Sequence, residues 1–444
     1  MRRAMPCRVL FVVLLLAVAA PAVAKPELSV PADLSVPDPG PVRLTGLAPG
    51  DQVTLETFRA TSAGMILTGA ALFRADASGE VDTATLAPLA GDYREVDPLG
   101  LFWSATRSLD PAAPAPMAGH VTIRARSGDA IIAQAEARIG PDPQTLTTET
   151  APFPGAFITR PADNQRHPVV IVLGGSEGGD KTARAMAPLF AAQGYFVVGL
   201  PYYAPARGQV GRIAGLPESF TNIAVDRLAR VRDWLRHQPR ADAAAIGLWG
   251  VSKGAEFAAI AAAHYDWLRA VALIVPSDVV WEGWGKDSAR TSSFAFEGHS
   301  LAFVPYLGID LEFARLSRGE PMQLVRAHRA GRAAYPERIA AARIPLERYT
   351  GALLVAGGRD DRIWPSAEMA EAIVRERADA GLPTVSLVFE RAGHALAGPG
   401  SDPVADYTAN GGEAPFIARA RAELWRATAR FFKRNLAPSG NAGR

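Results

Sequence analysis

Cysteine is almost absent from this sequence, because Cys7 is the only one in 444 residues. A single cysteine can form no disulfide within the chain and supplies no cluster of thiolates for a metal ion. No two of the seven histidines stand at the spacing of zinc ligands. We therefore expect no metal site and no bound cofactor.

Long apolar runs and a surplus of one charge are also missing. The chain holds no run of about 20 apolar residues, the length needed to cross a bilayer. Basic and acidic residues number 47 and 45, so there is no basic surplus for nucleic acid. Apolar residues make up 48% and charged residues 21%, the balance of a folded globular protein. At this length we expect two domains.

The N-terminus has the features of a secretion signal. Three arginines, Arg2, Arg3 and Arg8, precede an apolar run at 9–20, and small residues follow at 22–24. We expect residues 1–24 to be a cleaved signal peptide, so that the protein is exported to the periplasm or secreted. A membrane anchor is the alternative, but the run is short for one. Cleavage before Lys25 also removes Cys7 and changes the formal net charge from +2 to −1.

Residues 25–145 have the pattern of a small all-β sandwich domain. Apolar and polar residues alternate in short segments, with glycine and proline between them and no long helical period. The candidate strands are 52–58, 66–73, 121–125 and 133–139. A proline-containing break at 140–143 and a threonine-rich stretch up to Thr150 indicate a linker.

Residues 151–437 alternate strands with helices, which predicts an α/β fold with a doubly wound, mostly parallel sheet. The expected strands are 169–173, 195–200, 245–249, 270–275, 352–356 and 385–389. The expected helices are 182–193, 219–237 and 253–264. The stretch at about 277–350 interrupts this alternation and is interpreted as a cap over the site. Residues 438–444 are expected to form a flexible tail.

Two serines stand in a Gly-x-Ser-x-Gly pattern, which places a serine on a sharp strand-to-helix turn. At Ser252 a strand ends at Trp249 and a helix begins at Lys253, as this turn requires. Ser176 follows the first strand, where this fold places an oxyanion loop, so its role as nucleophile is the less favoured alternative. We expect the backbone amides of Ser176 and Lys253 to form the oxyanion hole.

An acid and a base follow Ser252 in the order that a hydrolase triad requires. His394 comes after the last predicted strand, and a turn with two aspartates comes after the strand before it. Asp361 is favoured over Asp360 by its distance from Gly358. The predicted triad is therefore Ser252, His394 and Asp361, with the carboxylate orienting the imidazole and the imidazole taking the serine proton.

The cap contains a group of aromatic residues whose role the pattern leaves open. They either form an ordinary core or line a pocket for an acyl group. They are Trp281, Trp284, Phe294, Phe296, Phe303 and Tyr306.

Several strings in both halves of the chain resemble the acyl-CoA thioesterase and bile acid-CoA:amino acid N-acyltransferase family. The N-terminal strings are residues 71–76, 79–82, 91–93 and 97–103. The C-terminal strings are residues 153–155, 200–203, 216–218 and 246–256, the last containing Gly-Val-Ser-Lys-Gly-Ala-Glu. The resemblance implies an acyl-CoA thioesterase-type β-sandwich, a catalytic α/β-hydrolase domain, the triad above and a place in lipid metabolism.

The resemblance also implies a reaction, the hydrolysis of fatty acyl-CoA or related small-molecule thioesters through an acyl-enzyme. Members of the family that transfer acyl groups to amino acids carry cysteine as nucleophile, so Ser252 favours water as acceptor. Three alternatives stay open at this point. They are a carboxylesterase or peptidase acting on a substrate without CoA, an N-acyltransferase, and a binding protein without catalysis.

Overall fold

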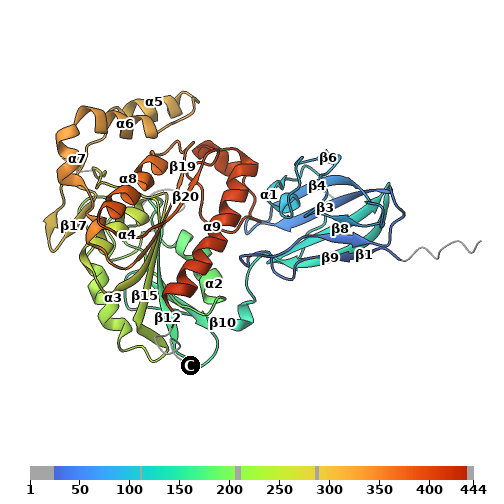
Figure 1. Cartoon of the computed structure of the whole chain (residues 1–444), viewed down its shortest axis with the longest axis horizontal. Coiled ribbons are helices and arrows are strands. Elements are labelled where there is room, and N and C mark those ends of the chain that lie inside the picture. The colour runs from blue at the N-terminus through green and yellow to red at the C-terminus, as the bar shows by residue number, and fades with distance from the viewer. Residues whose placement is uncertain (1–24, 111–112, 206–211, 286–289, 438–444) are drawn as a thin grey trace, which may run out of the picture.

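The computed structural model describes residues 25–110, 113–205, 212–285 and 290–437. The expected signal peptide at 1–24 and the expected tail at 438–444 lie outside the described residues. Figure 1 shows a small β-structure built from the N-terminal part of the chain beside a larger α/β structure, with the last helix between them.

The N-terminal part is a β-sandwich, as predicted. One sheet has the strand order β1-β2-β5, and the other has the order β6-β4-β3-β8-β9, with β7 also paired to β4. The strands are β1 Glu27–Ser29, β2 Arg43–Thr45, β3 Gln52–Ala60, β4 Ile66–Arg74, β5 Val81–Asp82, β6 Ala90–Gly91, β7 Thr106–Arg107, β8 His120–Ser127 and β9 Ala130–Arg138. A one-turn helix, α1 (Gly100–Trp103), lies at one end.

Alternation along the strands explains the sandwich. In β3, Val53, Leu55 and Thr57 are buried while the residues between them are partly exposed. Because side chains alternate across a strand, this segment presents one apolar face, which must pack against a second layer. Leu44 of the other sheet is fully buried in the same core.

The C-terminal part is built on a sheet with the order β10-β11-β13-β12-β15-β16-β19-β20. Neighbouring strands from β13 to β20 are parallel, and the two strands at the opposite edge are antiparallel. The strands are β10 Leu146–Thr150, β11 Phe157–Pro161, β12 His167–Leu173, β13 Phe196–Gly199, β15 Ala241–Val251, β16 Leu268–Ile274, β19 Ala352–Gly358 and β20 Val385–Phe389.

Helices cover both faces of this sheet, which is therefore doubly wound as predicted. Val170 and Val172 of β12 belong to a buried cluster that includes residues of α2 and α9, whereas Val169 and Ile171 belong to one that includes residues of α3, α4 and α8. Strands buried on both faces need continuous apolar sequence, and β12 has it. These helices are α2 Lys181–Ala191, α3 Arg227–Leu235, α4 Lys253–His264, α8 Ser366–Asp379 and α9 Ala414–Asn435.

The stretch between β16 and β19 covers one end of the large structure. Its strand β17 (Phe294–Phe296) pairs with β14 (Ile223–Ala224) and with β18 (His299–Ser300). Its helices are α5 Ile309–Ser317, α6 Val325–Ala334 and α7 Pro336–Ala342. In Figure 1, α5 and α6 lie above α8, and α7 and β17 lie at the left edge. Short 3-10 helices occur at η1 Pro143–Thr145, η2 Leu346–Arg348 and η3 Ala405–Asn410.

Two expectations about secondary structure were wrong. The threonine-rich stretch expected to be linker forms β10 and pairs with β11 at the edge of the sheet. The helix expected over 219–237 begins only at Arg227, because Ile223 and Ala224 pair with the cap strand β17. Among the described residues, no helix is both long and apolar enough to cross a bilayer.

The last helix joins the two parts of the protein. The indole Nε1 of Trp425 on α9 donates a hydrogen bond to the backbone oxygen of Ser35, 2.9 Å away. Ser401 donates to the backbone oxygen of Leu34 at 2.8 Å. The sandwich core and one face of the large sheet merge into a single cluster of buried apolar residues, which includes Trp103 and Trp425. The two parts are therefore packed together.

Candidate active site

Ser252 lies on the sharp turn between β15 and α4. Its backbone has φ 57° and ψ −123°, a conformation that residues with a side chain seldom adopt. A Cβ atom at Gly250 would lie 2.2 Å from the backbone oxygen of Gly254, and one at Gly254 would lie 2.2 Å from that of Gly174. Both flanking positions therefore require glycine, which is the physical basis of the Gly-x-Ser-x-Gly pattern at this turn.

A continuous chain of hydrogen bonds runs from Ser252 to a buried carboxylate. The Oγ of Ser252 lies 2.9 Å from Nε2 of His394, and Nδ1 of His394 lies 2.8 Å from Oδ2 of Asp361. Since Asp361 can only accept, Nδ1 carries the proton and Nε2 is left to accept the proton of the serine hydroxyl. The arrangement can deprotonate a nucleophilic serine.

The structure distinguishes the two aspartates of the turn after β19. Asp361 is 5% exposed, and its carboxylate meets His394. Asp360 points elsewhere, because its Oδ2 accepts from the backbone N–H of Gly412 at 2.8 Å. Adjacent residues thus have separate partners, and only Asp361 lies against the imidazole.

Ser366 is a site residue that the sequence reasoning did not identify. Its hydroxyl, at the start of α8, donates to Oδ2 of Asp361 at 2.6 Å. The backbone N–H groups of Ile363 and Trp364 donate to Oδ1 at 2.8 and 3.2 Å. These bonds fix the carboxylate in position. A serine directly after Pro365, in a pattern common at helix starts, is the signal that could have identified it.

The glycine-rich turn after β12 lies against the serine turn. A Cβ atom at Gly175 would be 3.2 Å from the Cβ of Ser252. The side chain of Glu177 folds back and accepts from the N–H of Gly175 at 3.1 Å and from the hydroxyl of Thr182. This carboxylate therefore holds the loop in shape. The hydroxyl of Ser252, not that of Ser176, bonds to His394.

The two amides expected to form an oxyanion hole are available for a ligand. Within the described part of the chain, the N–H of Ser176 has no hydrogen-bond partner. The N–H of Lys253 is the first of α4, and the first N–H groups of a helix have no partner within the helix. Both residues line the same cavity as Ser252.

The side chain of Lys253 is fully engaged beneath the site, which was not predicted. Its Nζ lies 2.7 Å from Oε2 of Glu256 and 3.0 Å from the hydroxyl of Ser293 in the cap. Glu256 also accepts from the N–H of Trp281 at 3.0 Å. Burial lowers the pKa of Lys253 and raises that of Glu256, while their mutual contact opposes both shifts. The pair ties the serine helix to the cap.

A cavity of about 1340 Å³ opens beside Ser252, between the cap and the sheet. The aromatic residues of the cap belong to the core or pack against it, as Trp281 and Phe294 do by full burial and Phe296 and Phe303 by partial burial. Trp284 and Tyr306 pack in the same way and also line the cavity. In the described residues, no three His, Cys, Asp or Glu side chains gather in an arrangement that could hold a metal ion.

The doubly wound sheet, with a serine on the turn between β15 and α4, defines an α/β hydrolase. The family described as BAAT / Acyl-CoA thioester hydrolase C terminal matches residues 229–438. The family described as Acyl-CoA thioester hydrolase/BAAT N-terminal region matches residues 38–126. The chain therefore belongs to the acyl-CoA thioesterase/BAAT family, as its resemblance predicted, and its fold and relatives support a hydrolase.

Curated relatives match along most of their length. The chain is 25% identical over 441 residues to acyl-coenzyme A thioesterase 5 of Mus musculus, covering 90% of this chain and 94% of the relative. It is 24% identical over 429 residues to acyl-coenzyme A thioesterase 6 of Mus musculus, with the same coverage. It is 26% identical over 368 residues to peroxisomal succinyl-coenzyme A thioesterase of Mus musculus, covering 77% and 78%.

Proposed function

We propose that this protein is a serine thioesterase that hydrolyses acyl-CoA or related acyl thioesters to a free acid and a thiol. The observation that supports the proposal is the hydrogen-bonded chain from Ser252 through His394 to Asp361. Its position beside a cavity of about 1340 Å³ leaves room for a sizeable substrate. The relatives named as acyl-CoA thioesterases support the substrate class.

In the first half of the proposed reaction, Nε2 of His394 takes the proton of Ser252 as its Oγ attacks the thioester carbonyl carbon. The carbonyl electron pair moves onto oxygen, where the amides of Ser176 and Lys253 stabilise it. When the intermediate collapses, the C–S bond breaks and His394 gives its proton to the leaving sulfur. The acyl group is then an ester of Ser252.

In the second half, a water molecule replaces the thiol. His394 takes a proton from the water, whose oxygen attacks the acyl carbon. The bond from that carbon to Oγ breaks, Ser252 regains its proton, and the acid leaves. Asp361 keeps the proton of His394 on Nδ1 and stabilises the imidazolium formed in both halves. Losing one oxyanion donor typically raises the barrier by about 2.7–4 kcal/mol.

The proposal is tested by comparing thioesters, oxygen esters and peptides as substrates of the purified protein. We expect acyl-CoA thioesters to be hydrolysed with the highest kcat/KM and Ser252→Ala to lose activity by roughly 10⁶-fold. Ser127→Ala, which removes an exposed serine of β8, is the matched control and should match the wild type. Circular dichroism checks that both variants are folded.

The outcomes of this comparison separate the alternatives. A fluorophosphonate probe should label the peptide containing Ser252, and labelling at Ser176 instead would overturn the assignment. Faster turnover of oxygen esters or peptides would indicate a carboxylesterase or peptidase. Formation of an amide when glycine or taurine is added would indicate an N-acyltransferase. Activity of Ser252→Ala close to that of the wild type would exclude the mechanism.

We also propose that the protein is exported, to the periplasm or the medium. The support is the basic, apolar and small-residue order of residues 1–24, which lie outside the described part of the chain. N-terminal sequencing of the protein from its native host should begin at Lys25. A mature chain that begins at Met1 would contradict this proposal without bearing on the chemistry.

A further inference from the structure

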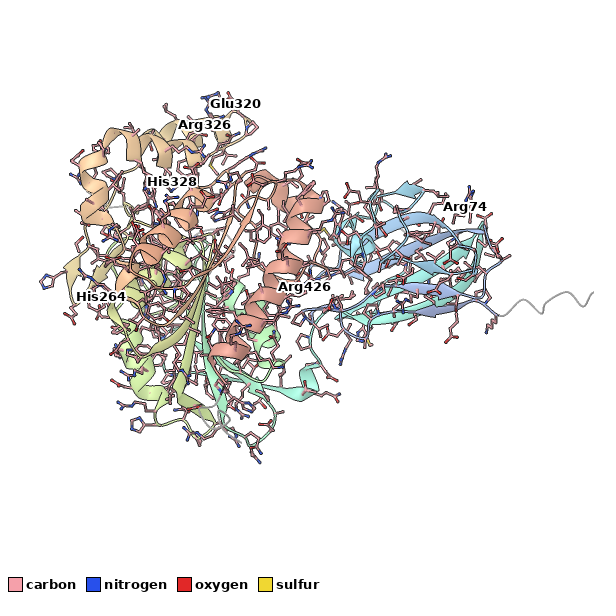
Figure 2. All side chains as sticks on the ribbon, viewed as in Figure 1. Arg74, His264, Glu320, Arg326, His328 and Arg426 are labelled. Atoms are coloured by element: carbon pink, nitrogen blue, oxygen red, sulfur yellow. The ribbon has the colours of Figure 1, made fainter. Side chains whose placement is uncertain are left out.

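A buried histidine of the cap lines the same cavity as Ser252. His328 lies on α6, is 4% exposed, and faces inward. Figure 2 shows it on the inner side of the cap, whereas Glu320 and Arg326 lie toward the outer end. Its ring packs edge-on against Trp281 and Tyr306, with centroids 4.6 and 4.9 Å apart. The histidine is therefore held rigidly in an aromatic wall.

The hydrogen bonding of His328 defines which nitrogen faces a ligand. Nδ1 lies 2.9 Å from the backbone oxygen of Leu324, and since a carbonyl oxygen only accepts, Nδ1 is the donor. Nε2 has no partner among the described residues. Burial lowers the pKa of His328 to about 3, so the ring is neutral at physiological pH. Nε2 is thus a fixed hydrogen-bond acceptor that no protein group uses.

Two other polar groups of this wall also lack partners. In the part of the chain that the structure describes, the hydroxyl of Tyr306 makes no hydrogen bond, and its pKa is raised well above its usual value by burial. Nε1 of Trp364 is buried and has no partner. The Trp364 ring lies 5.8 Å from the rings of both His328 and His394. The side chain of Trp364 therefore lies between His328 and His394.

A bound acyl group would separate these polar groups from water, and a polar group cut off from water is costly unless the ligand pairs with it. An acceptor such as neutral Nε2 pairs with an O–H or N–H group and disfavours a carboxylate, which can only accept. An all-hydrocarbon acyl chain would leave Nε2 of His328 and the hydroxyl of Tyr306 unpaired. The chemistry that fits is a substrate whose acyl group carries a hydroxyl or an amide N–H.

We propose that His328 is a specificity residue that accepts a hydrogen bond from a hydroxyl or amide N–H on the acyl group of the substrate. The inference rests on the proposed function and names the substrate class of that site. The hydroxyl of Tyr306, which lines the same cavity, donates to the oxygen of the same group. The enzyme then prefers hydroxyacyl or amide-bearing acyl thioesters to plain acyl thioesters of equal length.

The test compares kcat/KM for octanoyl-CoA, β-hydroxyoctanoyl-CoA and an amide-bearing acyl-CoA of equal length. The wild type should favour at least one polar substrate by roughly tenfold, the worth of one hydrogen bond to the substrate. His328→Phe should remove this preference, so that kcat/KM for the polar substrates falls relative to that for octanoyl-CoA in the same variant. His328→Gln, which keeps an acceptor, should restore part of it. His237→Phe, on the surface at the end of α3, is the matched control.

Each outcome of this comparison supports or overturns the proposed role of His328. Equal kcat/KM of the wild type on all three substrates overturns the inference, as does an equal loss on all three in His328→Phe, which marks a packing residue. If His328→Phe does not fold, the wild-type ratios and His328→Gln still decide. Absence of any thioesterase activity in a folded wild type refutes the proposed function instead. The two failures are therefore distinguishable.

Discussion

At the scale of single residues, the carboxylate of Asp361 is the most constrained group of the site. It accepts from His394, Ser366 and two backbone N–H groups. The carboxylate of Asp360 accepts from the N–H of Gly412 and lies 3.9 Å from the guanidinium of Arg362. Because Asp360 and Asp361 are adjacent and carry the same charge, substituting each in turn distinguishes loss of the triad carboxylate from disturbance of the turn.

Asp361→Asn should lower kcat on the order of 10⁴-fold, because an amide no longer holds the proton of His394 on Nδ1. Asp360→Asn should change kcat less than about threefold, since its carboxylate only orders the loop. Steady-state kinetics of the two variants measure the difference. Comparable losses in both would show that the turn, not the identity of the carboxylate, controls activity.

His328 makes stability depend on pH. Its pKa is about 3 in the folded protein and 6.5 when exposed. Between these values the unfolded chain binds more protons, so stability falls as pH falls, by up to about 1.4 kcal/mol per pH unit. His328→Phe should therefore lose less stability than the wild type between pH 6.5 and 4, measured by urea unfolding. Parallel pH profiles would contradict this.

At the scale of elements, a buried ion pair within the first turn of α4 is hydrogen-bonded to the cap. Lys253 and Glu256 are both buried, and the partners of the pair beyond α4 are Ser293 and Trp281. A charge left unpaired at this depth is strongly destabilising. The ion pair therefore couples the placement of the cap to the helix that carries Ser252.

Lys253→Met should lower the free energy of unfolding by about 3–5 kcal/mol, because it leaves the buried carboxylate of Glu256 unpaired. The double variant with Glu256→Gln should recover much of this loss, since the amide keeps an acceptor for Trp281 without a charge. Lys181→Met, at an exposed position of α2, is the control. Chemical denaturation measures all three, and equal stabilities of single and double variants would refute the coupling.

The sequence patterns predicted those elements whose signal lies in a short stretch of neighbouring residues. Continuous apolar strands such as β12 and the glycine turn at Ser252 reveal themselves through residue type alone. The strand β10 was missed because it is polar and lies at the edge of the sheet. The segment before α3 was misread because Ile223 pairs with a cap strand some 70 positions away, and no local period encodes that pairing.

The same division holds for the site. The residues Ser252, Asp361 and His394 follow strand ends, so their order and spacing indicate a common edge of the sheet. The roles of Lys253 and His328 come from burial against the cap, which is a tertiary property. A lysine within a Gly-x-Ser-x-Gly motif and a histidine on an amphipathic helix are both ordinary surface patterns. Their environment, not their spacing, makes them distinctive.

At the scale of the whole molecule, the sandwich and the sheet share one buried cluster through α9. We therefore expect the protein to unfold in a single calorimetric transition. Trp425→Ala, which removes the indole that contacts Phe190 and bonds to Ser35, should lower stability by about 3–5 kcal/mol. Two resolved transitions in the wild type would show that the two parts fold independently.

The bond from Trp425 to Ser35 joins residues 390 positions apart. At ordinary synthesis rates, about 20 to 80 s separate their appearance on the ribosome. During that interval α1 has no α9 to cover it, and its apolar side chains are open to contact with other nascent chains. We expect this waiting period to limit the yield of the protein more than the stability of its finished state does.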